Sequence, residues 1–425
     1  MIKTKTIQIF EHQHIQVGDN GFEKSHWETL GYYNENHGGR YFTLTPKGIR
    51  FCNYVGVIQV GNLNIEVLPK IGKVVGEADK TKWQKVLIDM LRECRWMKVY
   101  ANEKAALRFK PNSILEAYLE LFLQHCEEII RQGLVKKYRT TDDNCGALKG
   151  KLLLNKQLHI NLIHQERFYV RHQTYDRENI FNQILLKALK LIPSICQSPV
   201  LSDRVANLRL LFPELEDILV NYSTFEDLIY DRKTIRYQEA IEIAAMLLLN
   251  YRPDISTGHN HVLAILFDMN DLWEEYIFRQ LNKFKPQDWL IGAQNTKKFW
   301  QSANSTSSKV IRPDIVIYNK TNDSRIILDT KWKIPENNVP ADSDLKQMFV
   351  YNEYWSGKNA LLVYPTADYT DIPEFFGGSF SKKEALLTTH NCGLMKVSVL
   401  DKNHTKLDNT IGKRINEFLN DEIFK

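Results

Sequence analysis

RPDIVIYNKTNDSRIILDTKWK, residues Arg312 to Lys333, contains two β-prone runs, Asp314–Tyr318 and Arg325–Trp332. The segment between them, Asn319–Ser324, is rich in residues that form turns, so the whole stretch predicts an antiparallel hairpin. The apolar run Ile326-Ile327-Leu328 leads directly into Asp329. We therefore expect a buried strand that ends at a charged group.

Charged side chains meet at the end of this predicted hairpin. Because side chains alternate between the two faces of a strand, Asp329 and Lys331 share one face. Asp314 comes from the neighbouring strand. Two carboxylates can bind a hard cation such as Mg²⁺, and a lysine can orient water or stabilise phosphate charge, which predicts phosphodiester cleavage. The other interpretation is an exposed hairpin whose ion pair contributes little stability.

Composition limits the class of protein. With 425 residues, two or three domains are expected. The chain is 43% hydrophobic and 25% charged with a net charge of +5, an ordinary globular composition that is compatible with a nucleic-acid partner. The N-terminus shows no signal peptide and no stretch predicts a membrane span, so we expect a cytoplasmic protein. The six scattered cysteines form no CxxC pair and predict neither a zinc site nor disulfides.

Changes in periodicity divide the chain into three predicted domains. Residues 1–78 contain several short strands, among them two that a Gly61-Asn62 turn joins, and predict a β-rich, barrel-like domain whose expected role is binding. Residues 79–257 show helical periodicity and predict a mainly helical connector domain. Residues 258–425 contain the hairpin. The predicted fold class is therefore α+β, with several domains.

A basic segment interrupts the helical part of the chain. Leu134–Arg177 interleaves lysine and arginine with tyrosine and phenylalanine, as in VKKYR and RFYVRHQTYDR. Such a segment can follow a phosphate backbone. A solvated connector with some aromatic residues in the core is an equally good interpretation, and the sequence leaves both open.

The last domain alternates helices and strands around the hairpin. Leu263–Leu281 predicts an amphipathic helix before it, and Ser343–Trp355 predicts a helix after it with Asp344 as its N-cap. Two further strands, Ala360–Tyr364 and Leu394–Leu400, precede a terminal helix, Ile411–Leu419. This order predicts an α/β sandwich around a mixed sheet.

The pattern Pro313-Asp314, fourteen residues, Asp329-Thr330-Lys331 resembles the PD-(D/E)xK signature of restriction-endonuclease-like nucleases. In the RecB-like branch, a glutamate on the preceding helix joins the metal site, and Glu274 matches that place better than Glu275. The same branch has a Q-x-x-x-Y helix after the lysine, as Gln347 and Tyr351 are placed here. The resemblance implies three Mg²⁺ ligands, a lysine that positions the nucleophile and two supporting residues: Asp314, Asp329, Glu274, Lys331, Gln347 and Tyr351.

Nearly the whole chain resembles the McrC family, the nuclease subunits of McrBC-type restriction systems. The stretches that carry the resemblance are Val55–Ile71, Gly146–Leu189, Phe267–Phe278, the hairpin and Ser343–Tyr351. The resemblance implies an endonuclease subunit of a modification-dependent complex that cleaves double-stranded DNA carrying methylcytosine. It also implies a McrB-like AAA+ GTPase hexamer as partner, with the N-terminal part docked in the ring and stimulating GTP hydrolysis, so that residues 1 to about 170 alone should raise the GTPase rate.

The expected nucleotide cofactor belongs to the partner. The chain has no GxxxxGK[ST] motif, so GTP would act through the partner subunit while Mg²⁺ acts at the hairpin. Two alternatives remain. A stand-alone RecB-like DNA repair nuclease would cut without any GTPase, and an adaptor would mainly activate a GTPase and use the nuclease site secondarily.

Overall fold

The structure is a computed structural model that describes residues 5–36, 38–71, 77–94, 96, 113–196, 198–252, 261–303, 306–382 and 385–424. Its contacts divide the chain into two compact units. The first comprises Met1–Lys5, Gln59–Asn62 and Ala106–Ile265, and the second comprises Thr6–Ile58, Leu63–Ala105 and Leu266–Lys425. The predicted division at residues 78 and 257 stays a prediction, and its second boundary lies outside the described residues.

The beginning of the chain forms two open sheets. The elements are β1 (Lys5–Phe10), β2 (His14–Gln16), α1 (Lys24–Asn36), β3 (Phe42–Thr45), β4 (Gly48–Phe51), β5 (Tyr54–Val60), β6 (Leu63–Leu68) and α2 (Glu77–Glu93). One sheet has the order β2-β4-β3, and the other has the order β1-β6-β5-β11-β10, with β10 at Tyr251–Arg252 and β11 at Val262–Asp268. Gly61, at φ 56°, begins the predicted turn between β5 and β6.

Two expectations for this part are corrected. Among the described residues the strands close no barrel, because they separate into two sheets with free edges. Helix α1 was not predicted, since its sequence KSHWETLGYYNEN is mostly polar and carries only a weak apolar stripe. The general class, a mixed α+β protein with several sheets, is confirmed.

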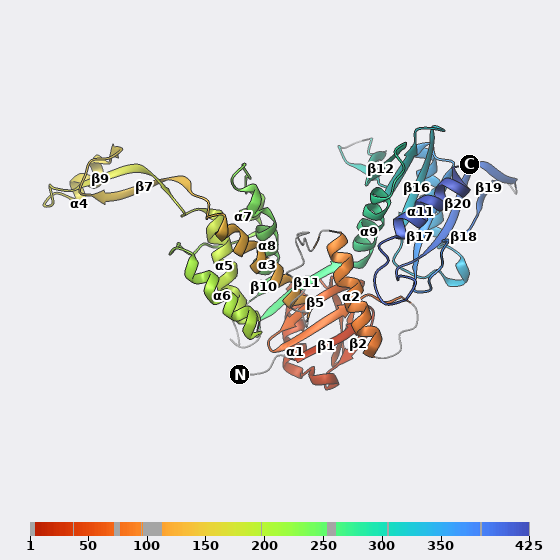
Figure 1. The fold of residues 1–425 in the computed structure, drawn as a ribbon, viewed down its shortest axis with the longest axis horizontal. Helices are drawn as coiled ribbons and strands as arrows, with labels where there is room; N and C mark the ends of the chain where they lie inside the picture. The colour runs from red at the N-terminus through yellow and green to blue at the C-terminus, as the bar shows by residue number, and fades with distance from the viewer. Residues whose placement is uncertain are drawn as a thin grey trace. The chain divides into compact units, whose positions relative to one another are not determined.

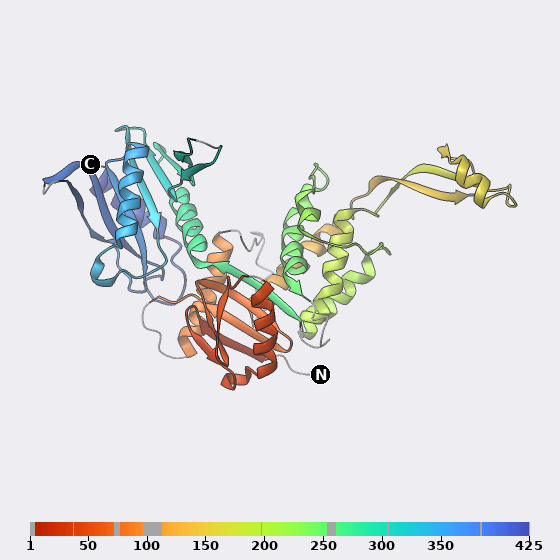
Figure 2. The ribbon, with the colours of Figure 1, turned by 180° about the vertical axis from the view of Figure 1, so that it is seen from behind.

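The first unit combines a helical body with a long two-stranded arm. The body contains α3 (Ile114–Arg131), α5 (Ile180–Ile195), α6 (Pro199–Leu211), α7 (Tyr222–Glu226) and α8 (Gln238–Asn250). The arm pairs β7 (Lys137–Cys145) with β9 (Phe168–Asp176) over their whole length and also carries β8 (Lys151–Leu152) and α4 (Leu154–Ile160). Figures 1 and 2 show this arm extending from the helices with α4 at its far end. The basic segment of the sequence is therefore this arm and its base.

The second unit contains the hairpin in a seven-stranded mixed sheet of order β12-β15-β16-β17-β20-β18, with β19 paired to β20. Its strands are β12 (Trp289–Ala293), β15 (Ile315–Asn319), β16 (Ser324–Thr330), β17 (Asn359–Thr366), β18 (Glu374–Phe376), β19 (Ser379–Lys382) and β20 (Ala385–Ser398), and β13 (Lys297–Gln301) pairs separately with β14 (Ser308–Ile311). Helix α10 (Asp342–Trp355) packs on β16, β17 and β20, whereas α9 (Met269–Lys283) and α11 (Ile411–Phe418) pack on each other and on the sheet (Figures 1 and 2).

Two local predictions in this unit are wrong. The expected helix Leu263–Leu281 begins only at Met269, because the apolar run Val262–Phe267 forms strand β11 and Asp268 caps α9 by accepting from the Asn270 N–H. Asp344 is not a cap. It lies inside α10, where its buried carboxylate pairs with Lys333. Among the described residues, no helix is long and apolar enough to cross a membrane.

Candidate active site

The hairpin places Asp314 and Asp329 at the same end of the sheet. Strands β15 and β16 pair in antiparallel register with Ile315 opposite Leu328, so Asp314 lies beside the position of Asp329. Asp314 Oδ2 accepts hydrogen bonds from the Thr330 backbone N–H at 2.6 Å and from Thr330 Oγ1 at 3.0 Å. Asp329 is 1% exposed, and its Oδ2 lies 2.6 Å from Lys331 Nζ.

A chain of polar contacts orients Lys331. Its backbone N–H donates to Val363 O of β17 at 3.0 Å, and its Nζ donates to Gln347 Oε1 at 3.4 Å. Gln347 Nε2 in turn donates to Tyr351 Oη at 2.7 Å, and that hydroxyl donates to Arg312 O at 2.8 Å. The i,i+4 spacing on α10 puts the glutamine and the tyrosine on one face, so they connect the lysine with the start of the hairpin.

Helix α9 brings Glu274 toward the hairpin. Gln294 Nε2 donates to Glu274 Oε1 at 2.9 Å, and Asp314 is the charge with the largest effect on the Glu274 carboxylate. Glu275 instead forms an ion pair along the helix with Arg279 at 2.5 Å. The structure thus places Glu274, rather than its neighbour, in electrostatic contact with Asp314.

Burial and like charge control protonation at this site. Burial, followed by the Asp314 charge, raises the pKa of Asp329 to about 7 although Lys331 acts against it. Burial and Asp314 likewise raise the pKa of Glu274 to about 7, and burial raises the pKa of Asp314. Burial alone would lower the pKa of Lys331, but the neighbouring Asp329 and Asp314 carboxylates outweigh it and raise that pKa. Near pH 7, Asp329 and Glu274 are therefore each partly protonated.

A hard cation fits this arrangement. Both oxygens of Asp329 are buried, and the ion pair of Oδ2 with Lys331 Nζ is the polar contact that the carboxylate makes. A buried carboxylate whose charge is met by Lys331 alone is costly, and a bound divalent cation would relieve both this cost and the repulsion from Asp314. Within the described part of the chain, no three acidic, histidine or cysteine side chains already converge as a complete ligand set. Glu274 would therefore have to approach the aspartates when a cation binds.

Three residues of the site had no functional assignment from sequence. Thr330 fixes Asp314, Gln294 holds Glu274, and Asp344 accepts from Lys333 Nζ at 2.7 Å beside the site. Thr330 is the middle residue of the D-T-K motif, but the motif does not indicate that the Thr330 hydroxyl donates a hydrogen bond to Asp314. Gln294 lies in a loop with φ 51° and carries no recognisable pattern.

Comparisons with known proteins agree with the fold. The family described as McrBC 5-methylcytosine restriction system component matches residues 49–365. A chain of the tetradecameric assembly of Thermococcus gammatolerans McrB AAA+ hexamers with bound McrC superposes with a TM-score of 0.72 at 20% identity, covering 98% of this chain and 100% of that one. A chain of the Thermococcus gammatolerans McrBC complex superposes with a TM-score of 0.51 at 20% identity, covering 65% of this chain and 87% of that one. No curated protein matches the chain.

The raised pKa of Asp329 predicts how stability depends on pH without metal. A carboxyl whose folded-state pKa lies above the unfolded value stabilises the fold at low pH, and this contribution is lost as pH rises toward about 7. We compare the unfolding free energy of Asp329→Asn with that of wild type in EDTA. The difference, variant minus wild type, should be about 1–2 kcal/mol larger at pH 8.5 than at pH 5.5, because only the wild type loses the contribution of this carboxyl as pH rises. Urea unfolding at both pH values measures this gain.

Asp342→Asn is the matched control, because that side chain is 91% exposed on the same unit. An Asp329→Asn difference from wild type that is equal at both pH values would contradict the prediction.

Proposed function

Because the chain belongs to the family of McrBC 5-methylcytosine restriction system components, we propose that it is the endonuclease subunit of such a system. Its substrate would be double-stranded DNA that carries modified cytosine, and its reaction would be hydrolysis of a phosphodiester bond. The observation that carries the proposal is the meeting of Asp314, Asp329 and Lys331 at the end of one hairpin.

The residues of the site suit this reaction. Asp314, Asp329 and Glu274 would hold Mg²⁺. The ion, when bound, polarises the scissile phosphate and makes a bound water more acidic. Lys331 would orient the attacking water and stabilise the charge that develops on the phosphate. Gln347 and Tyr351 would fix the lysine ammonium, because they form the contacts that continue from it to the hairpin.

A McrB-like AAA+ GTPase hexamer is the proposed partner, and GTP would bind to that partner. One similar solved assembly contains McrB AAA+ hexamers with bound McrC, and the present sequence has no phosphate-binding loop motif of its own. The far end of the arm offers a surface for such a partner, because apolar side chains cluster there in solvent. They are Leu148, Leu154, Leu158, Ile160, Leu162 and Ile163, each at least 51% exposed.

Plasmid cleavage tests the nuclease. We expect the chain with partner, Mg²⁺ and GTP to cut methylated but not unmethylated plasmid. Asp329→Ala and Lys331→Ala should each slow cutting at least about 100-fold, the scale of losing one transition-state contact. Lys320→Ala, an exposed lysine in the turn of the same hairpin, should cut like wild type.

Other outcomes separate the alternatives. Cutting that needs no partner but is lost in Asp329→Ala would indicate a stand-alone nuclease. Stimulated GTP hydrolysis without cutting under any condition would indicate an adaptor. Cleavage at the wild-type rate by Asp329→Ala would contradict the proposed mechanism.

The arm provides a test of the partner contact in the full-length chain. A fragment that ends near residue 170 would divide β9, whose nine residues pair with β7, and would therefore destroy the arm. Leu158→Asp combined with Ile163→Asp should instead lower stimulation of the partner's GTPase at least about tenfold, because charged groups cannot enter an apolar contact without a large desolvation cost. Rates of GTP hydrolysis measure the effect.

Leu210→Asp is the control for that experiment. Its side chain is 83% exposed on helix α6, outside the arm, and its substitution should leave stimulation unchanged. Equal stimulation by the arm variant and the control would show that the partner docks elsewhere.

A further inference from the structure

The residue after the site lysine is tied to the opposite end of the sequence. Trp332 Nε1 donates a hydrogen bond of 2.7 Å to Glu11 Oε1, across 321 positions of the chain. Glu11 is 1% exposed and Trp332 is 8% exposed, so water does not compete for this bond. Both residues belong to the second compact unit.

The Glu11 carboxylate is itself held firmly. The Lys70 backbone N–H donates to Glu11 Oε1 at 2.8 Å, and the Glu11 backbone N–H donates to Leu68 O, the last residue of β6, at 2.9 Å. Burial is costly for a carboxylate, and here the Lys70 N–H and the Trp332 indole both donate to Oε1, while Oε2 is buried without a hydrogen bond. The end of the N-terminal sheet thus presents a fixed acceptor to the Trp332 indole.

The same indole supports both sides of the site. Its ring contacts Trp273 edge to face, with ring centroids 5.4 Å apart, and Trp273 directly precedes Glu274 on α9. Trp273 Nε1 donates to Val363 O at 3.4 Å, and this carbonyl also accepts the Lys331 backbone N–H at 3.0 Å. A shift of the indole would therefore move the lysine strand and the glutamate helix together.

We propose that Glu11 is a positioning residue for the nuclease site: through the Trp332 indole it fixes the end of β16 and thereby Lys331. The inference rests on the proposed nuclease function. The N-terminal sheet would then help to position Lys331, in addition to any contact that it makes with a partner.

Three variants test the role of Glu11. Glu11→Ala and Trp332→Phe both remove the hydrogen bond, whereas Glu11→Gln keeps an acceptor oxygen for the indole. We expect the first two to lower kcat for cleavage about tenfold or more, because small misplacements of catalytic groups are costly. KM for DNA and stimulation of the partner's GTPase should stay at wild-type values. Glu11→Gln should cut nearly like wild type, and Glu11→Ala combined with Trp332→Phe should be no slower than either alone.

Hydrogen exchange of the backbone provides a readout that needs no cleavage. Amides of Thr330–Lys333 should exchange faster in Glu11→Ala and Trp332→Phe, but not in Glu11→Gln. Unchanged exchange in Glu11→Ala, or cleavage by it at the wild-type rate, would overturn the positioning role while the nuclease stands. A wild-type chain that cuts under no condition would overturn the proposed function and this role together.

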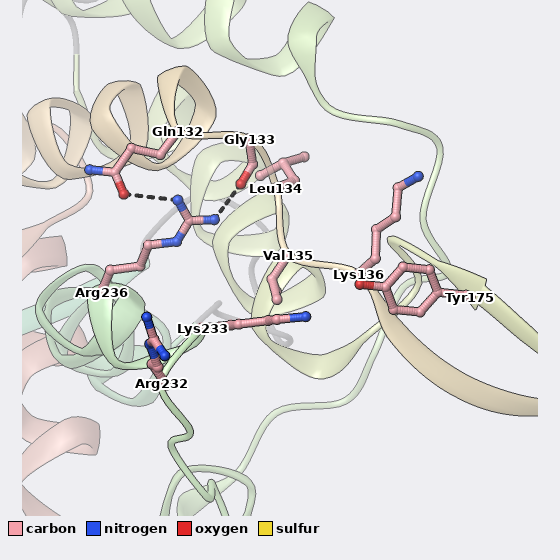
Figure 3. A pocket seen from close by; sticks show the side chains of 9 residues that line it. All are labelled: Gln132, Gly133, Leu134, Val135, Lys136, Tyr175, Arg232, Lys233 and Arg236. Atoms are coloured by element: carbon pink, nitrogen blue, oxygen red, sulfur yellow. Dashed lines mark hydrogen bonds between the residues drawn. The ribbon is translucent and has the colours of Figure 1, made fainter.

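A different observation concerns the base of the arm in the first unit. A pocket of about 410 Å³ lies there and is lined by Gly133, Lys136, Tyr175, Arg232, Lys233 and Arg236, among others (Figure 3). The pocket belongs to a different unit from the hairpin, so it is not the candidate active site.

The pocket carries positive charge from Lys136, Arg232, Lys233 and Arg236. Arg236 donates to Gln132 Oε1 at 2.8 Å and to Gly133 O, both neutral acceptors (Figure 3). Within the described part of the chain, no carboxylate forms an ion pair with Lys136, Arg232 or Lys233. Asp231 is occupied elsewhere, since its Oδ1 accepts two backbone N–H groups and its Oδ2 lies 3.8 Å from Lys137 Nζ.

An exposed aromatic pair indicates which anion fits. Tyr138 and Tyr175 face each other across β7 and β9 with ring centroids 4.7 Å apart, and they are 71% and 47% exposed. Cations can bind the phosphate backbone of a duplex, and exposed rings beside cations are typical of surfaces on which unpaired bases also stack. An acidic protein surface would need the cations but not the rings.

We infer that this pocket binds phosphate groups of DNA, as a second contact for the substrate of the proposed nuclease. In Mg²⁺-free buffer, a labelled DNA duplex should bind the full-length chain more weakly when Lys136→Ala and Lys233→Ala are combined. The affinity should fall at least about fivefold, and the slope of log affinity against log salt should become shallower by about 1.8, as expected for two lost phosphate contacts.

Lys190→Ala combined with Arg209→Ala removes two exposed cations from the helices of the same unit and should leave affinity and slope unchanged. An unchanged affinity and slope in the pocket variant would overturn the inference, as would a wild-type chain that binds no DNA at low salt. Weaker association of the pocket variant with the AAA+ partner, at unchanged DNA affinity, would assign the pocket to a protein and also overturn it. Because no cleavage is measured, these results are independent of whether the chain cuts.

Discussion

The burial of the Asp329 carboxylate beside the partly buried Asp314 is the constraint on which the mixed-sheet part of this protein depends. Asp314 and Asp329 lie at one end of the sheet, and burial, followed by the charge of Asp314, raises the pKa of Asp329 to about 7. Thr330 satisfies one oxygen of Asp314, and Lys331 supplies one positive charge. The Asp329 oxygens remain without hydrogen bonds. Such a site lowers the stability of the fold, and perturbed carboxyl pKa values of this kind are common at functional sites.

Rigid elements hold this unfavourable arrangement in place. Lys331 is fixed from one side by the Gln347 and Tyr351 contacts of α10 and from the other by the strand that Trp332 continues. The indole of Trp332 reaches Glu11, so the N-terminal sheet and the mixed sheet share one buried polar contact. A group that must act within a few tenths of an ångström gains from support by several elements, because no single side chain restrains all its motions.

The other compact unit has a different chemical character. Its arm ends in exposed apolar side chains, and its base carries cations beside two exposed tyrosines. Neither feature stabilises a monomer, since exposed apolar groups and unpaired cations gain little from the surrounding protein. Both are understandable as contact surfaces, one apolar for a protein and one basic for a phosphate backbone. The proposed chemistry therefore lies in the second unit, and the two proposed contact surfaces lie in the first.

Local patterns in the sequence were enough to predict the hairpin, the helix with Gln347 and Tyr351, and the mixed α+β class, because alternation and i,i+4 spacing are set by neighbouring residues. They also brought Asp314, Asp329 and Lys331 together. They could not distinguish a buried strand from a helix in Val262–Phe267, since a continuous apolar run suits both. Only the tertiary structure revealed how the N-terminal strands divide into open sheets and that Glu11 meets Trp332. Contacts between such distant positions arise from packing, which leaves no periodic signal in the sequence.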